Sequence, residues 1–418
     1  MTAVETGAGS TAPVTDSGGL GAHAKAYIDK LRGGDLGALP ALSGLILLIL
    51  IFGITQPDFF SKINIANLFQ QGAAIIVIAM GLVFVLLLGD IDLSAGYAAG
   101  LCATIFTVLL TTHHVVWWVC ILTAIGVGIA IGLFNGIMVE KVGIPSFVVT
   151  LAMFLALQGL ALYFLGGGRN ISIFDKKMIA LDNNSMPPWL GWLFFVLVVA
   201  GFAGLQVYRR VKRVGRGLPA DPWSVILVRV GTIVVLGGLI VAFLNAERSQ
   251  NPALISLKGI PIIVPVVAAL ALFWTFILSR TRYGRHLYAL GGNREAARRA
   301  GIRVDRIRIS AFVICSAMAA VGGIILVSRS RGVYPDIGGS TILLYSVGAA
   351  VIGGTSLLGG KGRVLDAVIG GLLIAVIDNG MALAGYQAST KFVVTAGVLL
   401  LAATVDALSR RRAAASGR

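Results

Sequence analysis

Long stretches without a single Asp, Glu, Lys or Arg constrain this chain more than any other feature. A helix that crosses the hydrocarbon core of a bilayer needs about 20 mainly apolar residues. Only helices and closed barrels satisfy all backbone polar groups there. The stretches therefore predict a series of membrane-spanning helices. They cover residues 36–57, 63–89, 93–139, 142–168, 183–208, 259–279, 309–328 and 337–360.

The length and interruptions of the apolar stretches set the number of crossings. Residues 93–139 are long enough for two helices, and His113 and His114 mark a turn between them. The glycine-rich part 341–358 favours a broken or re-entrant segment. The fold class that we predict is all-α, a polytopic transmembrane helical bundle with about 10–12 segments. Weaker segments, each of which contains or borders a charged residue, are 224–245, 364–384 and 391–408.

The composition supports membrane embedding and excludes several other classes. Only 12% of residues are charged, whereas soluble domains carry roughly 25%. The net charge of +16 does not indicate nucleic-acid binding, because the basic residues form short clusters between apolar runs, as membrane topology requires. The three cysteines lie in apolar runs without C-x-x-C spacing, so they predict neither a metal site nor a disulfide framework.

The distribution of Lys and Arg predicts the orientation and the domain boundaries. These residues concentrate in alternate loops, which places both termini in the cytoplasm. We expect a polar cytoplasmic tail at 1–38, a transmembrane domain at 39–408 and a basic cytoplasmic tail at 409–418. Residues 280–308 would form the largest cytoplasmic loop.

That loop contains the pattern of a short helix outside the membrane. Asn293 is suited to the N-cap, Glu295 to the first turn, and Gly301 to the C-terminal stop. Ala296 and Ala297 favour helix between them. A basic helix here could serve only as a topology anchor against the lipid. Alternatively, it could be a docking element for a partner that drives the permease.

Two pairs of polar residues interrupt the apolar pattern and are candidates for gating or for the translocation path. An ionisable group inside a membrane segment is by default a functional hypothesis. Asp90 and Asp92 precede Ser94, and Asp92 could cap the next helix, so we favour a capping or gating role over solute contact. Asp378 and Asn379 lie within a predicted span, where pore lining and an interhelix hydrogen bond are equally compatible with the sequence.

The sequence contains no recognisable catalytic or nucleotide site. Residues 354–362 resemble a P-loop only superficially, because Thr355 occupies the first glycine position and Gly362 follows Lys361. No catalytic triad or acid/base pair is evident, so we expect no enzyme activity and no bound cofactor or metal.

Five sequence blocks resemble the permeases of binding-protein-dependent ABC importers. Residues 295–301 match the E-A-A-x-x-x-G signature of that family, and their flank resembles its monosaccharide branch, the ribose, arabinose and xylose permeases. The extra hydrophobic segments in 187–258 resemble the xylose transport system permeases within that branch. The resemblance covers roughly residues 40–410, and its blocks are 89–96, 144–151, 283–301, 351–357 and 378–380.

The resemblance implies a permease subunit in the bacterial cytoplasmic membrane that translocates a monosaccharide, with D-xylose as the expected substrate. It implies a cytoplasmic ATPase docked on the 280–308 loop, an extracytoplasmic sugar-binding protein and a homodimer. Asp90 stands where the family more often has Glu, and Asp378 stands where Asn is usual. The alternative is a secondary, ion-coupled transporter with Asp90, Asp92 or Asp378 as its coupling site.

Overall fold

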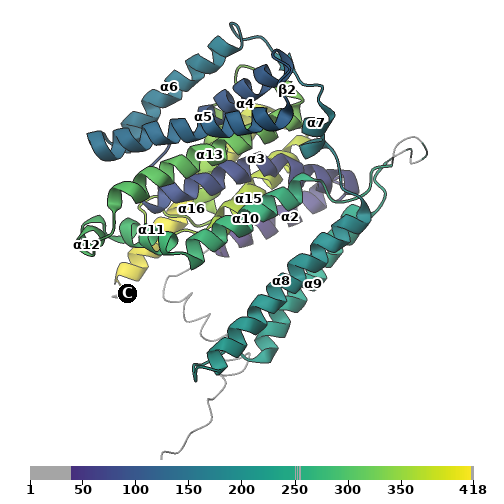
Figure 1. Cartoon of the computed structure of the whole chain (residues 1–418). Helices are drawn as coiled ribbons and strands as arrows, with labels where there is room; N and C mark the ends of the chain where they lie inside the picture. Colours follow the sequence, from purple (N-terminus) through teal and green to yellow (C-terminus); the bar gives the residue numbers. More distant parts are fainter. Residues whose placement is uncertain (1–38, 250, 252, 254–255, 416–418) are drawn as a thin grey trace, which may run out of the picture.

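The computed structural model describes residues 39–415 except 250, 252, 254 and 255, and the described elements are almost all helical (Figure 1). The first half of the chain forms α2 (Leu39–Thr55), α3 (Lys62–Leu87), α4 (Ala95–Thr111), α5 (Trp117–Ile137), the π-helical turn η1 (Met138–Val142), α6 (Ser146–Phe164), β1 (Ile171–Ser172), α7 (Lys176–Asn183) and α8 (Pro188–Val214). The second half forms α9 (Trp223–Asn245), α10 (Ile263–Arg280), α11 (Arg282–Gly292), α12 (Arg294–Arg299), α13 (Val304–Ser330), β2 (Gly332–Val333), α14 (Ser340–Ile352), α15 (Val364–Leu383) and α16 (Ala388–Ala415).

The described helices agree with the predicted membrane bundle. Eight of them are long and apolar enough to cross a membrane, and four shorter apolar helices accompany them. In the glycine-rich segment, for which we predicted a broken or re-entrant helix, α14 ends at Ile352 and a loop follows it. The predicted tail 1–38 lies outside the described residues, as do 416–418, whereas α16 continues through residues 409–415 of the predicted C-terminal tail.

The helix α3 forms the centre of the bundle, where α13, α14, α15 and α10 pack around it (Figure 1). Its second half, residues 72–87, is buried on every side. Such a helix needs apolar residues all round rather than one apolar stripe. The two short strands pair antiparallel, with Ile171 opposite Val333, at the end of the bundle away from α12.

Close contact between α5 and α13 depends on glycines four residues apart. A Cβ atom at Gly128 would lie 2.6 Å from the carbonyl oxygen of Ser316, and one at Gly136 would lie 2.8 Å from Cα of Ile309. A Cβ at Gly132, between them, would overlap the backbone of Phe312. Small residues at this spacing let membrane helices approach closely, where dispersion contacts stabilise them.

The helices α8 and α9 form a hairpin that extends away from the bundle (Figure 1). Val241 and Leu244 of α9 join Ala66 of α3 and Ile260 in a small apolar cluster, which anchors one end of the hairpin. Large apolar side chains are exposed along both α8 and α9, and both helices have the length and hydropathy of membrane spans. Lipid is therefore the environment that suits most of the hairpin surface.

The glycine contact between α5 and α13 predicts a stability difference between two alanine substitutions in α5. Gly132→Ala should destabilise the fold by about 1–3 kcal/mol, because its Cβ displaces the α13 backbone. Gly126→Ala is the matched control, since nothing lies within 4 Å of its Cβ position. The thermal midpoints of the purified variants in detergent check this. Equal midpoints would contradict the close packing of α5 on α13.

Candidate translocation site and its coupling network

Two short helices, rather than the single predicted one, occupy the region 280–308. The predicted helix is α12, and its N-cap is confirmed, because Asn293 Oδ1 accepts a hydrogen bond of 2.9 Å from the Ala296 amide. Gly301 follows with φ of +80°, the left-handed conformation that ends many helices. The additional helix α11 buries Leu287 and Leu290 on one face, and this three-residue spacing was its available sequence signal.

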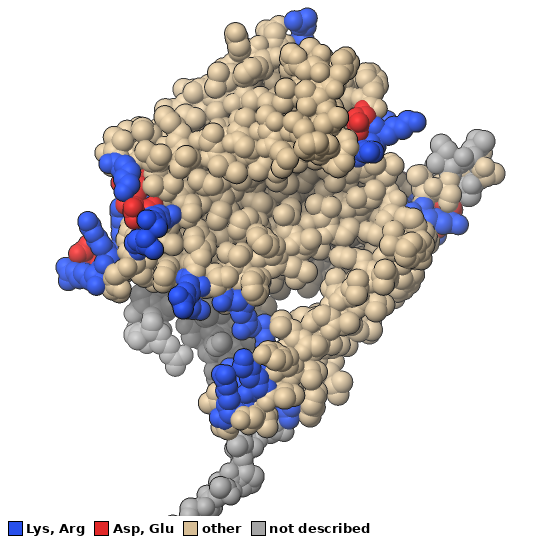
Figure 2. All heavy atoms as spheres, viewed as in Figure 1, with Lys and Arg blue, Asp and Glu red and all other residues tan. Residues whose placement is uncertain are grey.

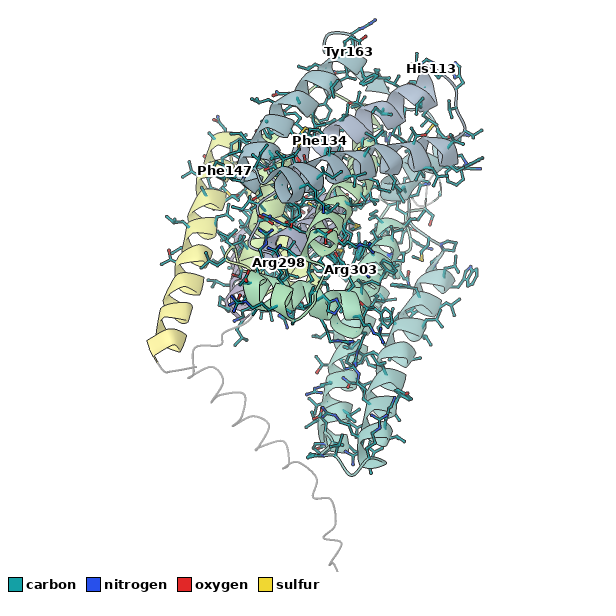
Figure 3. All side chains as sticks on the ribbon, turned by 60° about the vertical axis from the view of Figure 1, so that its left-hand side comes forward. His113, Phe134, Phe147, Tyr163, Arg298 and Arg303 are labelled. Atoms are coloured by element: carbon teal, nitrogen blue, oxygen red, sulfur yellow. The ribbon has the colours of Figure 1, made fainter. Side chains whose placement is uncertain are left out.

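The outer face of α12 is exposed, while its inner face packs on the bundle. Glu295 and Ala296 are exposed, and Glu295 pairs with Arg299 at 3.1 Å. Ala297 is buried against the chain's own core, so it anchors α12 and is not available to a partner. Figure 3 shows Arg298 and Arg303 on the same side of the molecule, away from the end that carries His113.

A chain of ion pairs, which we call the coupling network, joins α12 to the connection between α3 and α4. Arg294 on α12 binds both carboxylate oxygens of Glu140, at 3.0 and 2.8 Å. Glu140 also accepts from Arg308 at 3.0 Å. Arg308 on α13 then binds both oxygens of Asp90 at 2.7 Å. The Arg308–Asp90 pair is bidentate, and such a pair fixes geometry as well as charge.

The coupling network continues into a buried polar turn at the start of α4. Asp92 Oδ1 accepts from the backbone amide of Ser94 at 2.9 Å and from its hydroxyl at 2.6 Å. The Ser94 hydroxyl in turn accepts from Asn135 Nδ2 of α5 at 2.9 Å. Ser94 itself is the N-cap residue and makes no side-chain capping bond, so Asp92 holds the turn that precedes the cap.

A second connection links α11 to the end of α3 and to the loop after α14. Gly291 lies so close to Leu87 that any side chain would overlap the Leu87 carbonyl oxygen. The same carbonyl accepts from the Gly360 amide at 2.8 Å, and the Tyr288 hydroxyl donates to the Gly362 carbonyl at 2.6 Å. The glycines of this loop therefore provide close packing, as expected for a segment that only resembles a P-loop.

The opposite end of the bundle contains a cavity of about 620 Å³, within the size range of small-molecule sites. Its charged groups face each other in two pairs: Asp378 and Lys391 at 3.3 Å, and Asp182 and Arg329 at 3.9 Å. The remaining polar groups are neutral donors and acceptors, suited to hydroxyl groups of a solute. The lining comes from seven regions: Asn67, Gln70, Gln71 and Ile75; Asp182 and Asn183; Leu326, Arg329 and Ser330; Tyr334; Thr341, Ile342 and Tyr345; Asp378; and Ala388, Lys391 and Phe392.

The two residues of the predicted Asp378–Asn379 pair take different places. Asp378 lines the cavity, as pore lining would require. Asn379 is buried and makes two amide hydrogen bonds of 2.8 Å with Asn64 of α3, plus one of 3.2 Å to Gln71. Asp90 and Asp92 do not line this cavity. They belong to the opposite end of the bundle.

Asp182, the most unusual carboxylate at this end, was not indicated by any sequence pattern. It lies on the short helix α7, and its buried carboxylate oxygens have no hydrogen-bond partner among the described residues. Burial raises the pKa of Asp182 from 3.8 to about 7, and the charge of Arg329 opposes that rise only in part.

The described residues contain no group of three or more His, Cys, Asp and Glu side chains arranged to hold a metal ion. Cys102, Cys120 and Cys315 are free and buried.

Comparison of the sequence with known proteins shows the family to which the chain belongs. Residues 64–403 match the family described as branched-chain amino acid transport system / permease component. The chain is 33% identical over 379 residues to the xylose transport system permease protein XylH of Escherichia coli (strain K12), covering 89% of this chain and 92% of the relative. No solved structure matches significantly.

Two further relatives extend the same picture. The XylH protein of Haemophilus influenzae is 32% identical and covers 92% of this chain and 99% of its own length. The ribose import permease protein RbsC of E. coli (strain K12) is 30% identical, and the match covers 88% of this chain and 92% of the relative. The chain belongs to this family of transport-system permeases. It is a multi-pass protein of the bacterial cytoplasmic membrane and not an enzyme.

The raised pKa of Asp182 predicts a pH-dependent stability. Its folded-state pKa of about 7 lies above the unfolded value of 3.8, so ionisation destabilises the fold as pH rises between these values. Asp182→Asn should remove this dependence of stability on pH. At pH values above 7 the variant should have a higher thermal midpoint than the unmodified chain, and near pH 4 the two midpoints should be similar. Asp58→Asn, at an exposed position, is the control. Parallel pH profiles for Asp182→Asn and the unmodified chain would contradict the assignment.

Proposed function

We propose that this chain is the membrane-spanning subunit of an ABC importer that translocates a monosaccharide, with D-xylose as the expected substrate. The cavity carries the proposal. Its paired charges and neutral polar groups suit a neutral polyhydroxy solute, because hydroxyl groups need hydrogen-bond partners but no counter-ion. The curated relatives named above carry xylose or ribose in their names, which supports a pentose.

The orientation that we infer has α11 and α12 in the cytoplasm. Most of the Lys and Arg side chains on the face shown in Figure 2 lie along the edge formed by α11, α12 and the free end of the α8–α9 hairpin. A wide band without charge separates this edge from the opposite one. The positive-inside rule then places this edge in the cytoplasm, and the cavity would open to the outside. Both chain termini would be cytoplasmic.

The exposed face of α12 is the proposed docking site of the ATPase. Glu295 and Ala296 would contact the ATPase, while Asn293, Ala297 and Gly301 would hold the helix in shape. ATP would be bound and hydrolysed only by that partner, and this chain would bind no cofactor. An extracytoplasmic sugar-binding protein would deliver the solute to the cavity, and two copies of the permease would form a homodimer.

The coupling network would transmit the ATPase movement. A displacement of α12 would move Arg294, and with it Glu140, Arg308 and Asp90, because short ion pairs of 2.7–3.0 Å join them in series. Asp90, Asp92 and Ser94 would then gate the cytoplasmic end of the path. Asp378 and Asn379 would act at the cavity end.

Reconstitution into liposomes with the candidate ATPase and binding protein tests the proposed function. Labelled xylose should accumulate only when both partners and ATP are present, because the permease has no energy source of its own. A set of other monosaccharides and a branched-chain amino acid should be tested in parallel to identify the substrate. Uptake driven by a proton or sodium gradient without ATP would instead support the ion-coupled alternative.

A tryptophan substitution tests the docking role of α12. Ala296→Trp should reduce co-purification of the ATPase by about tenfold or more, since a bulky side chain would fill the proposed contact. Val214→Trp is the control, because it places the same side chain at an exposed position on the same edge of the molecule. Equal ATPase recovery for both variants would exclude α12 as the docking helix.

A further inference from the structure

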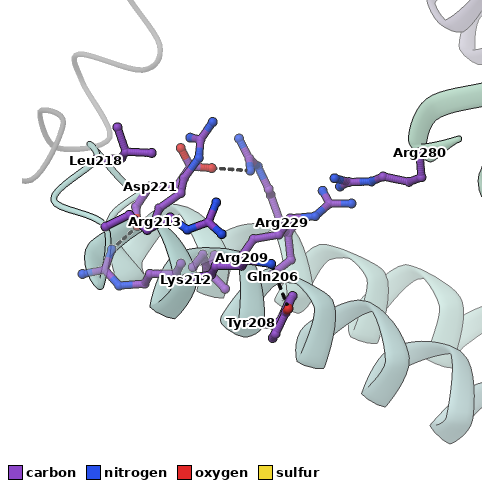
Figure 4. Close-up of a pocket in the computed structure, with 12 residues that line it drawn as sticks. Gln206, Tyr208, Arg209, Lys212, Arg213, Leu218, Asp221, Arg229 and Arg280 are labelled. Carbon is purple, nitrogen blue, oxygen red and sulfur yellow. Dashed lines mark hydrogen bonds and ion pairs between the residues drawn. The ribbon is translucent and has the colours of Figure 1, made fainter. Parts of the chain in front are cut away.

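The free end of the α8–α9 hairpin contains a strongly basic pocket of about 560 Å³ (Figure 4). It lies between the hairpin and the end of α10, from which Arg280 extends toward it. The function proposed above makes no use of this pocket. Its lining comprises Gln206, Tyr208, Arg209, Arg210, Lys212, Arg213, Arg216, Leu218, Asp221, Ile226, Arg229 and Arg280.

The positive charge of the pocket is not balanced by its own carboxylate. Asp221 is the one acidic residue in the lining, and its Oδ2 is already paired with Arg229 at 2.8 Å. Within the described part of the chain, Arg209, Arg213 and Arg280 have no carboxylate within ion-pair distance. Like charges held this close repel one another, so binding of an anion would stabilise the arrangement.

The surroundings of the pocket favour a lipid over a soluble anion. Leu218 in the pocket lining is itself exposed, and large apolar side chains such as Leu205 and Val211 are exposed along α8. On the facing side, Phe273 and Phe276 of α10 are exposed as well. Trp223, which stacks on Arg210 at 4.9 Å, stands at the pocket rim, where aromatic residues mark the membrane interface.

We propose that this pocket binds the phosphate headgroup of an anionic phospholipid, whose acyl chains lie against α8, α9 and α10. Basic pockets between membrane helices have the chemistry that headgroup phosphates require. The lipid fixes the free end of the hairpin relative to the bundle, whereas the apolar cluster of Val241 and Leu244 with Ala66 and Ile260 anchors the opposite end. Lipid binding at this pocket depends on membrane embedding and not on the identity of the transported solute.

Lipid binding to the purified permease in detergent tests the proposal. Cardiolipin and phosphatidylglycerol should bind more tightly than phosphatidylcholine in native mass spectrometry. The triple variant Arg209→Gln, Arg213→Gln, Arg280→Gln should weaken cardiolipin binding by roughly 100-fold, from about 1 kcal/mol for each basic residue. The control triple, Arg298→Gln, Arg299→Gln, Arg306→Gln, removes the same charge elsewhere on that edge and should bind cardiolipin normally.

Two further measurements separate lipid binding from misfolding of the variant and from binding of a free phosphate. Replacement of the same three arginines by Lys should retain binding, which distinguishes lost charge from misfolding. Inorganic phosphate should not displace the lipid at equal concentration, because it lacks the acyl chains. Equal cardiolipin binding by both Gln triples, or full displacement of the lipid by phosphate, would each overturn the proposal.

Discussion

The arrangement of the helices at the α12 end depends on the ion pairs that the Arg308 guanidinium forms with Asp90 and Glu140. The Arg308 side chain lies between these two carboxylates, is only 15% exposed, and connects α13, the α3–α4 connection and η1. A mostly buried charge is tolerated only when it is paired, and removing one partner from such a pair typically costs about 3–5 kcal/mol. The network therefore restricts these elements to a few arrangements in which every charge keeps a partner.

The central helix α3 relates the two ends of the permease. One end of α3 reaches the α11 contact at Leu87, and the other carries Asn67, Gln70 and Gln71 into the cavity. Between these ends the helix is buried on all sides and packed closely, so it behaves as a rigid element. A movement imposed at α12 would in this way reach the cavity without a continuous chain of polar contacts.

The apolar segments and the capping of α12 by Asn293 could be predicted from the sequence, because each depends on local composition or on a few neighbouring residues. The coupling network could not, because Arg294, Glu140, Arg308 and Asp90 are distant in sequence and meet only after the helices pack. Periodicity could have indicated α11, whereas Asp182 has no local signal, since only the packing of α7 on α13 makes it unusual.

If α12 drives the permease through the coupling network, then breaking the first ion pair should separate ATP hydrolysis from transport. Sugar uptake per ATP hydrolysed, measured in liposomes that contain the full transport system, tests this directly in Arg294→Gln and in the control Arg298→Gln. Arg294→Gln should keep ATPase association and ATP hydrolysis but lose most of the uptake per ATP, while Arg298→Gln should keep the ratio. An unchanged ratio in Arg294→Gln would contradict coupling through these ion pairs.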